Sequence, residues 1–260
     1  MRRVTPSRIA LWLVACVTLV FAAGAFAQQR AGAASGSEHL AMLAERTAKS
    51  YLQVAQGLLA SRSRRAVRES VREFDALLPR VGALAADAEA RENFVLLGLL
   101  WKELRSWAHK PPTRDNARAV SERAEEVSWI ASKGARLLGT QGSAQRAGLT
   151  AMRAATLAQR IARLYLLDRM GAMDARRVND LSEAKSGLAA TLTTLVAGPH
   201  DGGVDGELQM ARSQHDFLVS AMRDYDAAHS AAAMEVIAKT ADNIADSMER
   251  AARLYEAPPA

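Results

Sequence analysis

Histidines are the residues in this chain best suited to metal binding or acid–base chemistry, and there are five: His39, His109, His200, His215 and His229. A carboxylate-bridged di-iron site in a helical bundle needs two Glu-x-x-His pairs and two further inward-facing glutamates. The nearest pattern here is a single Asp226-x-x-His229. His215 falls on an apolar helical stripe, which favours a hydrogen-bonded core residue. The histidines therefore predict no metal centre.

Other chemical signatures are equally weak. The segment 198–206 has the glycine density of a phosphate loop, but no strand precedes it and no Lys-Ser/Thr follows. The chain has no G-x-S-x-G motif, and its one cysteine, Cys16, lies in the N-terminal apolar segment. A stripe of methionines, which with His215 would be the candidate haem ligands, has the spacing of a helix core: Met152, Met222, Met234 and Met248. We therefore expect a non-catalytic protein without metal or cofactor.

A segment that occurs twice organises the rest of the sequence. Residues 42–52, MLAERTAKSYL, recur at 156–166 as TLAQRIARLYL, 114 residues later. The same offset, without a gap, superposes Glu69 on Glu183 and Ile130 on Ile244. An offset held over most of the chain predicts one module present in two copies, at 28–140 and 141–260.

The polar residues that both copies keep are the candidate site. Arg46 and Arg160 are identical, and Glu45 and Gln159 are near-isosteric. These side chains either form part of a ligand or dimer site, or make a hydrogen bond or ion pair that fixes the register of the helices. Spacing within the sequence leaves both interpretations open.

Aromatic residues distinguish the first copy from the second: Phe94, Trp101, Trp107 and Trp129. Phe94 and Trp101 share a helical face with Leu97 and Leu104, which predicts core positions. Trp107 falls off that face and is a candidate for contact with a partner or with the other copy.

The first 27 residues have the pattern of a signal peptide. Arginines at positions 2, 3 and 8 precede an apolar run, and Ala25-Phe26-Ala27 fits a signal-peptidase site. The alternatives are an uncleaved membrane anchor and, less well matched, a lipobox at Leu13-Val14-Ala15-Cys16. Each predicts a protein outside the cytoplasm, and a bacterial periplasm fits best.

Charge gives no indication of nucleic-acid binding. The formal net charge is +6, and the three leader arginines account for half of it. The remaining chain is close to balanced, whereas a nucleic-acid-binding domain has a strong basic excess. We therefore expect no nucleic-acid partner.

Periodicity predicts helices throughout. Expected helices span about 38–61, 63–78, 88–109 and 114–138 in the first copy, and 144–170, 174–197, 205–228 and 230–256 in the second. Thr113 and Asp174 are the expected N-caps of two of them. In the last of these, apolar residues step by threes and fours: Met234, Ile237, Ala241, Ile244, Met248, Ala251 and Tyr255. Such seams are typical of antiparallel bundles. The expected fold is all-α, with two tandem antiparallel four-helix bundles after the signal peptide.

The repeated segment resembles the first-helix motif of the periplasmic sensor modules of PilJ-type chemotaxis transducers and NarX-type nitrate sensors. Their approximate pattern is A-G-R-Q-R-M-L-S-Q-R-I-A-K-x-Y-L-L. The second copy matches it at Leu157, Gln159, Arg160, Ile161, Ala162, Tyr165, Leu166 and Leu167, with Arg153 on its first arginine. The first copy matches at Leu43, Arg46, Ala48, Lys49, Tyr51 and Leu52. Two tandem modules would cover the whole mature chain.

The resemblance implies a four-helix bundle that senses a ligand and belongs to a signalling pathway. In the NarX-type members, a first-helix arginine holds an anion at a dimer interface, and that position is Ala41 in the first copy and Ala155 in the second. Arg153 lies about 200° around the helix from Ala155 and does not replace that arginine.

The repeated segment and its resemblance to the sensor modules suggest two functions. In the first, the protein binds a small anion or other small molecule through Arg46, Arg160, Gln159, Glu45 and Arg153, and presents it to a membrane receptor or signalling protein, alone or as a homodimer. In the second, it is a helical interaction scaffold with no small ligand.

Overall fold

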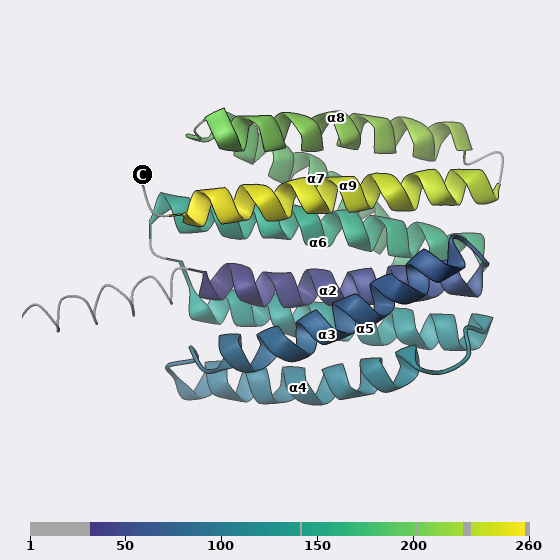
Figure 1. The fold of residues 1–260 in the computed structure, drawn as a ribbon, viewed down its shortest axis with the longest axis horizontal. Coiled ribbons are helices and arrows are strands. Elements are labelled where there is room, and N and C mark those ends of the chain that lie inside the picture. The colour runs from purple at the N-terminus through teal and green to yellow at the C-terminus, as the bar shows by residue number, and fades with distance from the viewer. Residues whose placement is uncertain (1–31, 141, 201, 226–229, 258–260) are drawn as a thin grey trace, which may run out of the picture.

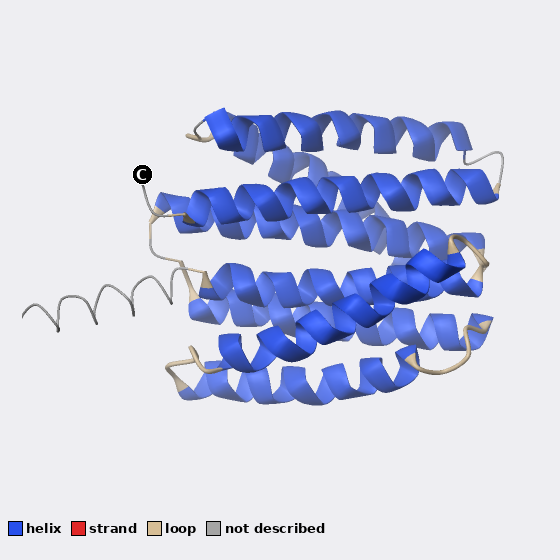
Figure 2. Cartoon of the chain, in the orientation of Figure 1, coloured by secondary structure: helices blue, strands red, loops and turns tan. Residues whose placement is uncertain are grey.

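The computed structural model describes residues 32–140, 142–200, 202–225 and 230–257. Within them the chain is all-helical, with no strand (Figure 1, Figure 2). The helices are α2 (Ala33–Ala55), α3 (Ala60–Gly82), α4 (Ala88–Ala108), α5 (Arg114–Leu138), α6 (Ser143–Arg169), α7 (Ala175–Ala197), α8 (Gly202–Tyr225) and α9 (Ala231–Glu256). None of these helices is apolar enough over a sufficient length to cross a bilayer. The predicted signal peptide and Asp226-x-x-His229 lie outside the described residues.

All the predicted helices are present, and the largest differences in their boundaries fall on the first, second and seventh of them. The first begins at Ala33 and not near residue 38. The first ends at Ala55 and not near residue 61, because Gly57 and Leu59 take positive φ values of 72° and 44°. The second continues through Pro79 to Gly82. The glycine-rich segment predicted as a loop through Gly206 is shorter, since α8 begins at Gly202.

Side-chain caps start four of the helices. Asp174 accepts a hydrogen bond from the Arg177 amide at 2.9 Å, and Thr113 accepts one from the Asn116 amide at 3.3 Å. Both caps were predicted from the sequence. Asp87 and Ser230 cap α4 and α9 in the same way. Each cap satisfies an amide that has no partner within its own helix.

The helices of each half contact one another in a ring. In the first half α2 packs on α3, α3 on α4, α4 on α5 and α5 on α2, and α6 to α9 repeat this order. Two ion pairs show that α4 and α5 run in opposite directions. Glu89 pairs with Lys133 and Glu103 with Arg123 across α4 and α5.

The two halves meet through α2 and α6, which pack directly against each other. Thr156 Oγ1 donates to the Glu38 carbonyl oxygen at 3.4 Å, and Gln56 Nε2 donates to the Leu166 carbonyl oxygen at 3.2 Å. These pairs are separated by 118 and 110 residues, close to the repeat offset of 114. A nearly constant separation means that α2 and α6 are parallel and in register. The two copies therefore lie side by side with their first helices running in the same direction.

Both central helices are buried on nearly every side, and the buried apolar residues of the two halves form one continuous core. Small residues lie along the paired helices and are fully buried: Ala41, Ala44, Ala48, Ala155, Ala158 and Ala162. Their size allows the two backbones to approach closely. The predicted apolar seam of α9 is confirmed, since Ile237, Ala241, Ile244, Met248 and Ala251 are all 0% exposed. Phe94, Leu97, Trp101 and Leu104 of α4 are also buried, as predicted.

Gly134 marks a close helix crossing and gives a test of the packing. A Cβ at this position would lie 2.8 Å from Ser37 Oγ and 3.0 Å from Phe94 Cζ. Ser37 Oγ is held by its hydrogen bond to the Ala131 carbonyl at 2.7 Å, so it does not yield freely. We expect Gly134→Ala to lower the free energy of unfolding by about 1–3 kcal/mol in urea titrations, despite the better helix propensity of alanine.

Gly98→Ala is the matched control, because a Cβ there meets only Leu78 Cδ2 at an ordinary 3.7 Å. It should raise the free energy of unfolding by about 0.5–1 kcal/mol through helix propensity alone. Equal effects of the two substitutions would contradict the close approach at Gly134.

Candidate functional site

Glu45, Gln159 and Arg160, three of the residues kept by both copies, lie in a mostly buried polar layer formed by α2, α6 and α9, which we call the ionic layer. Its members are Glu45, Lys49, Gln159, Arg160, Arg163 and Asp242. Each of its charged groups has a partner of opposite sign on another helix. A charge removed from water is tolerated only with such compensation, so the layer imposes strict geometry on the helices that supply it.

Glu45 is the centre of one half of the layer. Its carboxylate is fully buried and accepts hydrogen bonds from Arg160 Nε at 3.0 Å and Arg163 Nε at 2.5 Å. Arg163 is 1% exposed and also donates to the carbonyl oxygen of Ser121 on α5 at 3.3 Å. Arg160 extends outward and donates to Ser128 Oγ at 3.2 Å. One carboxylate of the first copy thus holds two arginines of the second.

Asp242 of α9 is the centre of the other half. It pairs with Lys49, which is 1% exposed, and it accepts a hydrogen bond from Gln159 Nε2 at 3.0 Å. Near the surface, Arg46 donates to Glu249 at 2.8 Å and to Asp246 at 3.2 Å, also on α9. The cations of the first copy are therefore neutralised by the last helix of the second.

The difference between the copies explains why Glu45 is matched by Gln159. The position equivalent to Asp242 is Ser128 on α5, 114 residues earlier. In the first copy the central helix α2 supplies the carboxylate, Glu45, and the outer helix α5 supplies Ser128. In the second copy the central helix α6 supplies the neutral Gln159, and the outer helix α9 supplies the carboxylate, Asp242. A glutamate at 159 would place a second carboxylate beside Asp242, where like charges repel.

Glu45 and Arg160, two of the five predicted site residues, form an ion pair. Gln159 contacts Asp242, and Arg46 pairs separately with Asp246 and Glu249, and these three carboxylates all lie on α9. Arg153 is exposed and is not a member of the ionic layer. Lys49, Arg163 and Asp242 were not among the predicted site residues. For the first two a signal existed, since both copies keep a cation four residues after Glu45 or Gln159, which places it on the same helical face.

Two buried glutamates on α2 respond to this environment in opposite ways. Burial raises the pKa of Glu45, but the charges of Arg163 and Arg160 outweigh it and hold that pKa below its usual 4.5. Glu38 lies two turns away, and there burial dominates over hydrogen bonds from Ser132 and Thr156, so its pKa is raised. The surroundings of Glu45 thus favour its charged form, whereas burial disfavours the charged form of Glu38.

A surface groove of about 820 Å³ opens over Arg160, and we call it the cross-copy groove. Its walls come from both copies: α4 and α5 on one side, α6 and α7 on the other. The lining residues are Leu96, Leu100, Glu122, Glu125, Glu126, Trp129, Ile130, Arg160, Arg176, Arg177 and Asp180. The side chain of Trp129 is 60% exposed there.

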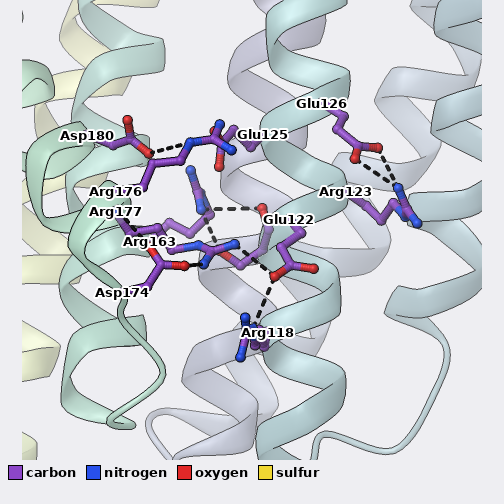
Figure 3. A network of polar contacts seen from close by, with 11 residues as sticks. Arg118, Glu122, Arg123, Glu125, Glu126, Arg163, Asp174, Arg176, Arg177 and Asp180 are labelled. Carbon is purple, nitrogen blue, oxygen red and sulfur yellow. Dashed lines mark hydrogen bonds and ion pairs between the residues drawn. The ribbon is translucent and has the colours of Figure 1, made fainter.

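Paired charges line this groove (Figure 3). Arg176 contacts Glu125 at 2.5 Å, and Arg177 contacts Glu122 at 2.8 Å, each across the boundary between α7 and α5. Three arginines therefore face four carboxylates. Arg177 Nε and Asp180 Oδ2 are buried and have no hydrogen bond among the described residues, although Asp180 Oδ2 lies 3.9 Å from Arg176 Nε in the ion pair drawn in Figure 3.

The histidines of the described residues are not part of any cluster of potential metal-ligating side chains. No group of three or more potential metal-ligating residues occurs within the described part of the chain. His215 is partly buried beside Asp216, at 3.4 Å, and is not a fully buried core residue. His200 lies in the turn before α8 and pairs with Asp205 at 3.4 Å.

Comparison of the chain with family models, with curated proteins and with solved structures found no match. The relation to PilJ/NarX-type modules therefore stays a prediction that rests on the repeated segment alone.

The two glutamates of α2 give an acid-titration prediction. Because the folded pKa of Glu45 is lowered, its contribution to stability is present above about pH 4.5 and is lost as the pH falls through the folded pKa. Glu45→Gln leaves Arg163 buried without its counter-charge. It should lower the free energy of unfolding at pH 7 by about 3 kcal/mol or more, with a shallower decline in acid.

Glu38→Gln should do the reverse. A raised folded pKa costs stability as the pH rises above 4.5, so removing the charge should stabilise the protein at pH 7 and have little effect in acid. Urea titrations between pH 3 and pH 8 measure both variants. If the two substitutions shift stability in the same direction at pH 7, the assignment of their charge states is wrong.

Proposed function

We propose that this chain is an exported, non-catalytic, sensor-like protein made of two tandem antiparallel four-helix bundles of the PilJ/NarX type. The observation that carries the proposal is the parallel, in-register pairing of α2 and α6. In the resembling sensors the first helices of two protomers meet at a dimer interface. Here two first helices meet within one chain, which supports a single-chain counterpart of that dimer. Because these faces are already occupied, we expect no homodimer through them.

The anion position of the resembling sensors is closed in this chain. Ala41 and Ala155 are both 0% exposed, and Ala41 lies on the face of α2 that carries Glu38 and Glu45 toward α6. Alanine offers no donor to replace the water of a buried anion. The proposed ligand site is therefore the cross-copy groove, which Arg160 connects to the ionic layer.

The charges of the groove favour a zwitterion over a simple anion. Its three arginines already have carboxylate partners, so a small anion gains little there. A molecule with both an ammonium and a carboxylate can meet the excess carboxylate of the lining with its ammonium and the 75% exposed Arg176 with its carboxylate. The exposed Trp129 ring offers a face for an ammonium or apolar group. We propose a ligand of the amino-acid type, whose bound state is presented to a membrane signalling partner.

The alternative is a helical interaction scaffold with no small ligand. It is favoured by the observation that Glu45, Arg46, Gln159 and Arg160 all have partners inside the chain. Under this alternative the ionic layer serves only to fix the register of the helices.

Thermal unfolding with a ligand panel separates the two functions. The panel contains amino acids, small anions and polyamines. A ligand at 100 times its dissociation constant adds about 2.7 kcal/mol, which raises the midpoint by several degrees. We expect an amino acid to give this shift, and Arg176→Ala and Asp180→Asn each to remove it. Arg176 has a side chain that is 75% exposed, so its loss leaves the unliganded midpoint nearly unchanged.

Arg153→Ala is the control, because it removes an exposed arginine of α6 outside the groove. It should retain the ligand-induced shift. A flat panel with a folded protein would favour the scaffold, and a shift given only by simple anions would contradict the zwitterion.

A further inference from the structure

A second groove lies on the first copy, away from the cross-copy groove, with a volume of about 740 Å³. We call it the arginine groove. Its floor is apolar, from Tyr51, Val54, Val67, Val71, Ala108 and Pro112. Its rim carries Arg64, Arg65, Arg68 and Arg72 of α3, with Lys110 and His109 opposite and Glu69 as the one acidic group. The two grooves share no lining residue.

Tyr51 fixes the wall opposite α3. Its hydroxyl donates to the carbonyl oxygens of Pro111 at 2.7 Å and Lys110 at 3.1 Å, and burial raises its pKa to about 12. The segment after α4 is thereby attached to α2. Lys110 lies over the Trp107 ring, 3.1 Å from its centroid. The groove is thus formed by defined contacts within the folded chain.

The rim has an excess of positive charge that the described chain does not neutralise. Five cations face one carboxylate, and none of the four arginine side chains has a hydrogen bond or ion pair with another described residue. The arginines of the cross-copy groove, by contrast, are all paired. Like charges held together raise the free energy of the empty groove, and an anion relieves that repulsion.

These arginines belong to the first copy alone. The offset of 114 places Val178, Asn179, Ser182 and Ser186 of α7 at the positions of Arg64, Arg65, Arg68 and Arg72. The equivalent helix of the second copy therefore forms and packs without them. Their role lies outside the folding of the module.

We propose that the arginine groove binds an amphiphilic anion, with a phosphate or carboxylate head and an apolar tail of lipid type. A rise of 1.5 Å per residue spreads Arg64, Arg68 and Arg72 over about 12 Å along α3, so a head group can pair with arginines at one end while an apolar tail extends along the groove. The half-buried Val67 and Val71 between the arginines accept an apolar group. The volume is in the range of small-molecule pockets.

Titration calorimetry with octyl phosphate, below its micelle concentration, tests the site directly. We expect binding that weakens with added salt, and binding of inorganic phosphate that is about tenfold weaker or more because it lacks the tail. Octyl glucoside, with the same tail and no charge, should not bind measurably. Equal binding of octyl glucoside, or equal binding of inorganic phosphate, would overturn the proposal.

The second copy supplies the variant. Arg68→Ser with Arg72→Ser introduces the residues that α7 carries at these positions, and it should weaken octyl phosphate binding by about tenfold or more. The control is Arg136→Ser with Arg212→Ser, which removes the same charge from two exposed positions elsewhere. If both double variants lose affinity equally, the effect is one of net charge and the groove is not the site.

Vesicles distinguish the source of the anion. The same two double variants are compared on phosphatidylcholine vesicles that contain about one third phosphatidylglycerol. Vesicle binding lost in Arg68→Ser/Arg72→Ser alone assigns the head group to a membrane lipid, and octyl phosphate binding without vesicle binding assigns it to a free molecule. Tighter binding of a glutamate-rich peptide than of octyl phosphate would overturn the proposal in favour of an acidic protein partner. None of these results depends on the amino-acid panel, so failure of one site leaves the other testable.

Discussion

The buried carboxylate of Glu45 is the constraint on which the arrangement of the helices depends. It is inaccessible to water, and its two partners, Arg160 and Arg163, both lie on the other copy. A half-turn rotation or a shift of α2 along α6 would leave a carboxylate and a guanidinium buried without compensation, at a cost of several kcal/mol. Apolar packing alone, between helices lined with alanine, tolerates such shifts more easily. The register of the central pair therefore comes from charge, and its closeness comes from small side chains.

This constraint also explains why the two copies form one body. The first copy supplies Glu45 to the arginines of the second, and α9 of the second supplies Asp242 and Glu249 to Lys49 and Arg46 of the first. Each copy alone would contain buried charges whose partners are missing. Among the differences between the copies, Glu45 is equivalent to Gln159, and Ser128 is equivalent to Asp242. These two differences are linked, because each copy supplies one carboxylate and each carboxylate is paired with a cation of the other copy.

The sequence predicted most of the fold and part of the site. Apolar residues at helical spacing predicted every helix, and Thr113 and Asp174 were recognisable as caps because a cap depends on neighbours in the chain. The early end of α2 was not predicted, since it depends on backbone angles at Gly57 and Leu59. The offset of 114 identified the residues that both copies share. Such an offset shows which positions are equivalent in the two copies, but it does not show which side chains are in contact. Asp242 could not be assigned to Lys49, 193 residues away, until α9 was placed beside the central pair.

The position of the ionic layer limits how a ligand could act on this protein. A ligand shifts a conformational equilibrium only through a difference in its affinity for the two states. Sliding α2 along α6 would break buried ion pairs, so a small molecule cannot easily supply the free energy for that movement. The outer helices of the two copies are joined to each other by a more exposed link between Arg176 of α7 and Glu125 of α5, in which the arginine side chain is 75% exposed. A ligand in the proposed cross-copy groove would therefore act where the copies can adjust, while the charges beneath it hold the central pair in register.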